Sequence, residues 1–133
     1  MCPDKAVFTY QGDGDLAAFA GVPFEKGEDG HGMMYPSMMF RVHGVDPARA
    51  GEAWNHFGPL MEQAERQGYR FSRKSPVIRP QTNPAEWRAN VTQLSNAEGG
   101  PVDGTDAWQL SAAEIDGRAQ AVNFVRFLRE FAP

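Results

Sequence analysis

The sequence has almost no cysteine, no long apolar run and no large excess of either charge. A single cysteine excludes an intrachain disulfide and a cysteine-rich zinc site. No apolar stretch approaches the roughly 18 residues that span a membrane, and no apolar core of a secretory signal follows the first residues. A net charge of -4 over 133 residues argues against a general attraction to nucleic acid. We therefore expect a cytoplasmic chain without a membrane partner.

Sequence signatures of common catalytic and nucleotide sites are also missing. There is no G-x-x-x-x-G-K-[ST], no G-x-G-x-x-G at a strand-to-helix turn, no H-E-x-x-H and no G-x-S-x-G. The spacing of His31, His43 and His56 does not demand zinc. Cys2 is alone and close to the terminus, where we do not expect the oriented base that a nucleophilic thiol needs. We expect no cofactor and no metal.

The chain does contain enough apolar sequence for one core and many residues that interrupt regular structure. Hydrophobic residues make up 41% of the chain, with 14 glycines and 10 prolines, which predicts a loop-rich single domain over residues 1–133. Residues 1–32 predict an irregular acidic arm. Residues 33–133 predict the folded core.

Alternation and helix signals predict an α+β fold. Apolar and polar residues alternate over 34–45 and over 69–78, which predicts two strands. Between them, Asp46-Pro47 is typical of a helix start and Gly68 of a helix end, with Pro59 interrupting the helix. A further helix is expected after Ser111. The predicted architecture is a small mixed β-sheet packed against two or three amphipathic helices. The sequence leaves open whether the two strands run parallel or antiparallel to each other.

Residues 83–98 allow two interpretations. As a strand, Trp87, Ala89 and Val91 would alternate. As a helix, Asn83 would be the cap and Pro84 the first residue. We favour the helix, because its start, apolar stripe and stop agree.

Charge is distributed unevenly along the chain. Residues 1–32 carry six acids and two bases, whereas the stretch from Arg66 to Ala85 carries five bases and no acid. We select four residues of this basic segment as a binding site: Arg70, Arg73, Lys74 and Arg79. The acidic arm is expected to lie across the segment.

The favoured functional hypothesis is a non-enzymatic binding protein, such as an adaptor, an inhibitor or an immunity-type module. It would bind a protein partner through the basic strand, since arginine and aromatic residues are common interface anchors.

Two alternatives remain open. In a small pocket enzyme or ligand-binding protein, His43 would be the general base, beside Arg41 and Tyr35. In a nucleic-acid-binding module, or one that binds another anionic ligand, residues 66–79 would contact the phosphates, and Tyr69 and Phe71 would stack on bases.

Overall fold

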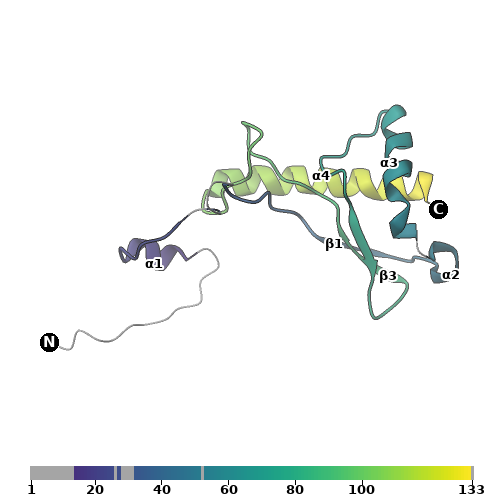
Figure 1. Ribbon diagram of the computed structural model, residues 1–133, viewed down its shortest axis with the longest axis horizontal. Coiled ribbons are helices and arrows are strands. Elements are labelled where there is room, and N and C mark those ends of the chain that lie inside the picture. The colour runs from purple at the N-terminus through teal and green to yellow at the C-terminus, as the bar shows by residue number, and fades with distance from the viewer. Residues whose placement is uncertain (1–13, 26, 28–31, 52, 133) are drawn as a thin grey trace.

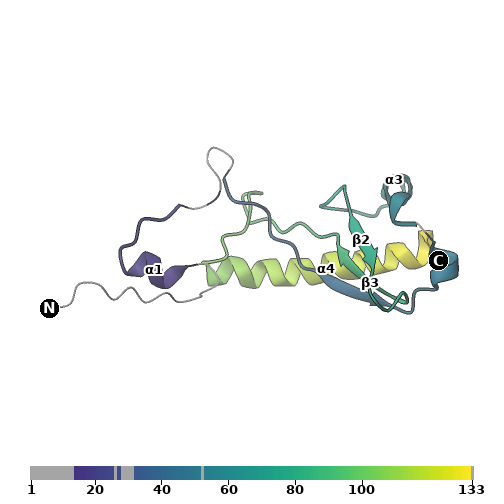
Figure 2. The same cartoon turned by 60° about the horizontal axis from the view of Figure 1, so that its bottom comes forward.

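The computed structural model describes residues 14–25, 27, 32–51 and 53–132. The elements follow in the order α1 (Asp15–Phe19), β1 (Phe40–His43), α2 (Pro47–Ala50), the 3-10 helix η1 (Ala53–Asn55), α3 (Phe57–Arg66), β2 (Val77–Pro80), β3 (Glu86–Asn90) and α4 (Ala107–Phe131). Figures 1 and 2 show α4 running along the length of the molecule, with the sheet and α3 at its C-terminal half and α1 at the opposite end.

The three described strands form one sheet in the order β1-β3-β2. Strand β3 is antiparallel to both of its neighbours. Strands β1 and β2 therefore run in the same direction, with β3 inserted between them. The predicted α+β single domain is confirmed. The expected mixed sheet is corrected to a sheet whose described pairings are all antiparallel, because β3 occupies the position where a direct β1–β2 pair would lie.

The preferred helix over residues 83–98 is wrong. Asn83 and Pro84 form a turn, in which Asn83 accepts hydrogen bonds from the N–H groups of Ala85 and Glu86. Strand β3 follows. Its backbone hydrogen-bonds to strands on both sides, and this tertiary pairing outweighs the local helix signals.

The two expected strands are shorter than the alternation predicts. Only Phe40–His43 and Val77–Pro80 are paired as β1 and β2. Residues 33–39 and 69–76 extend along the fold without a ladder. Alternation reports which side of the chain faces the core, and it does not require a hydrogen-bonded neighbour.

The helix expected after Asp46 forms in separate pieces. Asp46 caps α2 by accepting from the N–H groups of Ala48 and Arg49. The chain then turns through η1 before α3 begins. Pro59 lies in the first turn of α3, where a missing N–H leaves no intrahelical hydrogen bond unmade. Gly68 follows the end of α3 with a φ of 101°, as expected for a terminating glycine.

Helix α4 begins earlier than the sequence pattern predicts. Its cap is Asp106, which accepts from the N–H groups of Trp108 and Gln109. Ser111 lies inside the helix and donates to the carbonyl of Ala107. The expected start at Ser111 is therefore wrong, because the aspartate five residues earlier already satisfies the free N–H groups.

The core lies between the inner face of the sheet and helices α3 and α4. It joins Phe57 and Met61 of α3 to Trp87 of β3 and to Phe124 and Phe127 of α4. The Phe57 ring meets the Phe124 and Phe127 rings edge-on at centroid distances of 6.3 and 6.2 Å. Within the described part of the chain, no helix is long and apolar enough to cross a membrane.

Candidate functional site

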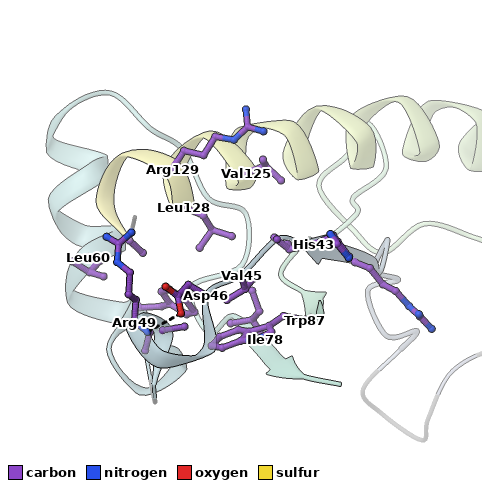
Figure 3. A pocket seen from close by; sticks show the side chains of 17 residues that line it. His43, Val45, Asp46, Arg49, Leu60, Ile78, Trp87, Val125, Leu128 and Arg129 are labelled. Atoms are coloured by element: carbon purple, nitrogen blue, oxygen red, sulfur yellow. Dashed lines mark hydrogen bonds between the residues drawn. The ribbon is translucent and has the colours of Figure 1, made fainter. Parts of the chain in front are cut away.

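A groove of about 710 Å³ opens between the β1 edge of the sheet, α2, α3 and the C-terminal part of α4. This volume lies within the range of small-molecule sites. Figure 3 shows Val125 and Leu128 pointing from α4 toward Val45, Ile78 and Trp87 on the opposite wall. The walls are therefore apolar, which suits an organic molecule with a hydrophobic part.

The mouth of the groove carries more positive than negative charge. Three arginines and one aspartate are among its lining residues: Arg41, Arg49, Arg129 and Asp46. Figure 3 places Arg49 and Asp46 at the α2 end and His43 at the β1 end, while Arg129 extends from α4 away from the apolar walls. An anionic group on a bound molecule would be attracted to this mouth.

Of the residues predicted for a pocket enzyme, the structure brings two to the groove. Arg41 and His43 are exposed residues of β1 that line it. Arg41 also forms an ion pair with Glu86 at 3.1 Å. Tyr35 does not line the groove, and its hydroxyl donates to the carbonyl of Gly99 at 2.9 Å. The role of His43 as a general base stays a prediction.

The predicted basic site divides into two parts. Arg70 turns back to donate to the carbonyl of Tyr69, and Lys74 forms an ion pair with Glu65 of α3. Both lie outside the three paired strands, whereas Arg79 belongs to β2 and donates to the carbonyl of Ile78 at 2.8 Å. Tyr69 and Phe71 stack on each other and meet Phe127 edge-on, so their rings belong to the core packing.

Arg73 and Arg79 do lie at one surface, the outer face of the sheet. Arg79 is opposite Arg88 across the β2–β3 pair, and Arg41 is opposite Arg88 across the β1–β3 pair. Arg73 donates to the side-chain oxygen of Asn90 at 3.0 Å, two residues along β3 from Arg88. We call Arg41, Arg88 and Arg79 the arginine row.

Arg88 was missed because residues 83–98 were interpreted as a helix. The alternation of Trp87, Ala89 and Val91 contained the signal: it predicts that Arg88 faces the opposite way from these three buried residues. The acidic arm was also placed wrongly in part, since α1 lies far from the sheet (Figure 1). Glu25 is exposed, and Asp13, Glu28 and Asp29 lie outside the described residues.

Comparison with protein families gives the general class. Residues 11–133 match the model of the family described as FAD dependent oxidoreductase. The chain belongs to this family. No curated protein and no solved structure matches it.

Membership of the FAD-dependent oxidoreductase family corrects the favoured function. A non-enzymatic adaptor, inhibitor or immunity-type module is wrong, because the match covers the whole described chain and points to an oxidoreductase. The nucleic-acid alternative also loses its stacking platform. Tyr69 and Phe71 face the core, away from the arginine row.

The described residues do not fit FAD by themselves. A dinucleotide site places the pyrophosphate at the N-terminus of a helix after a parallel strand and a glycine-rich turn. In the sequence, Gly12, Gly14 and Ala17 have a related spacing at the start of α1. However, α1 has five residues, none of them buried, and Asp15 in its first turn would repel a phosphate. The described strands pair only in antiparallel fashion.

A metal centre has no support in the described ranges. They contain no group of three or more His, Cys, Asp or Glu residues that could hold an ion. His31 and Cys2 lie outside the described residues.

Proposed function

We propose that this chain supplies the substrate side of an FAD-dependent oxidoreductase. The groove takes the organic molecule that reacts, and FAD is held by a separate dinucleotide-binding unit. The family match over residues 11–133 supports the oxidoreductase class. The groove, with its apolar walls and cationic mouth, supports the substrate-binding role. A cytoplasmic location stays a prediction.

The substrate class that suits the groove is an apolar molecule with one anionic group. Trp87, Val125 and Leu128 would cover the apolar part. The mouth would hold the anion. His43 would exchange a proton with the bound molecule, because an imidazole side chain can both accept and donate a proton.

Benzoate, a planar apolar carboxylate, tests the substrate groove. We expect methyl NMR signals of Val125 and Leu128 to shift saturably, with a Kd of about 1 mM. Ala132→Trp would fill the mouth and abolish these shifts. Ala112→Trp, on the exposed N-terminal half of α4, would leave them unchanged. Equal shifts in both variants would contradict binding in the groove.

The location of FAD needs a separate experiment. The purified chain is mixed with excess FAD and passed through gel filtration, and flavin in the protein peak is measured by visible absorbance. At a salt concentration that screens binding of the FAD phosphates to exposed arginines, we expect no retained flavin. Stoichiometric retention would show that the chain holds FAD by itself and would contradict that part of the proposal.

A further inference from the structure

We propose that the outer face of the sheet is an anion site that binds a small ligand through two adjacent phosphate groups, with Arg88 at its centre. The site is distinct from the groove and goes beyond the proposed substrate role, since Arg41 alone contributes to both.

The register of the sheet builds the site. Arg41, Arg88 and Arg79 are direct neighbours across three strands, and all are exposed. Directly opposite residues of antiparallel strands have Cα atoms about 4.5–5.5 Å apart. The Cα atoms of the three arginines therefore form a row about 10 Å long, from which the three guanidinium groups extend.

Positive charge exceeds negative charge on the outer face of the sheet. Glu86 is the acidic residue of the described strands, and its carboxylate lies 3.1 Å from Arg41, at one end of the row. Among the described residues, the Arg88 side chain has no hydrogen bond or ion pair. Arg73, held on Asn90, adds a fourth guanidinium near the row. Like charges directly opposite each other destabilise a sheet, so a ligand that neutralises them would be bound favourably.

The geometry favours phosphate over other anions. Arginine presents a planar fork that matches phosphate oxygens, and two adjacent phosphates place several acceptors within the reach of three such forks. Side chains on one face of an extended acidic peptide repeat every 6.6 Å or so, which is wider than the spacing of the row. The two aromatic residues of the basic segment, Tyr69 and Phe71, pack against the core, so base stacking of nucleic acid is not provided there.

Isothermal titration of the whole chain with inorganic pyrophosphate at low ionic strength tests the proposal. We expect saturable binding that weakens as salt is added. Arg88→Gln should weaken binding by about tenfold or more, since hydrogen bonds to a charged group are the strong ones. Arg88→Lys, which keeps the charge and loses the fork, should give an intermediate Kd.

Arg66→Gln is the matched control. Arg66 is an exposed arginine in the last turn of α3, and its loss changes the net charge by the same amount. We expect its Kd to stay within about twofold of the wild type. The proposal is overturned if Arg66→Gln weakens binding as much as Arg88→Gln, or if Arg88→Gln leaves the Kd unchanged.

Three further measurements separate loss of the site from loss of folding and test the ligand class. Thermal melting should show Arg88→Gln to be at least as stable as the wild type, because it removes like-charge repulsion. Arg79→Gln provides a second variant, with the same expected loss of pyrophosphate binding. A tetraglutamate peptide that binds more tightly than pyrophosphate would overturn the ligand class in favour of an acidic protein segment.

Discussion

Arg41 and Arg88 lie directly opposite each other in the antiparallel pair of β1 and β3, and both are exposed on the outer face of the sheet. Arg79 continues this row on the other side of Arg88. Repulsion between such neighbours is a local cost to folding. A position that lowers stability in this way is a candidate for function, because the rest of the fold compensates for it.

Replacing Arg88 with threonine should raise stability. The change removes like-charge repulsion from the middle of the row and introduces a β-branched residue that suits a strand. We expect a gain of about 0.5 kcal/mol in the free energy of unfolding at low salt, measured by urea denaturation. High salt should reduce the difference, since the exposed charges are then screened. A gain that persists in high salt would show that strand propensity, rather than charge, is responsible.

Phe127→Ala should destabilise the domain strongly. Phe127 is 0% exposed and its ring contacts Phe57, Phe71 and Phe124. Removing such a side chain leaves a cavity and costs about 4 kcal/mol. Val122→Ala, in the same helix but 52% exposed, should change stability by less than about 0.5 kcal/mol. If Phe127→Ala does not fold, Phe127→Leu, which leaves a smaller cavity, can be used in the same denaturation experiment.

Gly117→Ala should destabilise the protein, although alanine is the better helix former. A Cβ at Gly117 would lie 3.0 Å from Met38 Cε, 3.1 Å from Met38 Cβ and 3.1 Å from Leu94 Cδ2. Overpacking of this kind costs about 1–3 kcal/mol, which exceeds the roughly 1 kcal/mol gained in helix propensity.

Gly58→Ala is the control for this substitution. Gly58 also lies in a helix, and a Cβ there would have nothing within 4 Å. We expect Gly58→Ala to stabilise the chain by up to about 1 kcal/mol. If melting curves show that both substitutions change the melting temperature in the same direction, the close approach at Gly117 is contradicted.

Asp106→Ala should lower the melting temperature at neutral pH and have less effect in acid. Hydrogen bonds from the backbone N–H groups of Gln109 and Trp108 hold the pKa of Asp106 below its usual value of 3.8. The stabilisation is therefore fully present above that value and is lost as the pH falls through the lower folded-state pKa. Melting temperatures of wild type and variant should converge at low pH. Glu98→Ala, which removes an exposed loop carboxylate, should show no such convergence.

Local patterns were sufficient where a residue acts on its immediate neighbours. Asp46 before Pro47 predicted a cap, and Gly68 predicted a helix end, because both depend on nearby backbone groups. The α+β class followed from alternation and helical periodicity. Arg41 and His43 share one side of β1 and both line the groove, while their role in a pocket enzyme stays a prediction.

The sequence by itself determined the cap at Asp46, the helix end at Gly68, the α+β class and the uneven distribution of charge. The tertiary structure alone decided that residues 86–90 form the central strand, because that choice depends on hydrogen bonds to β1, which lies far away in the chain, as well as to the neighbouring β2. The same pairing aligned Arg41, Arg88 and Arg79, while Arg70 and Lys74 were drawn to local partners. Contacts distant in sequence, which periodicity does not encode, fix which charges gather on one face.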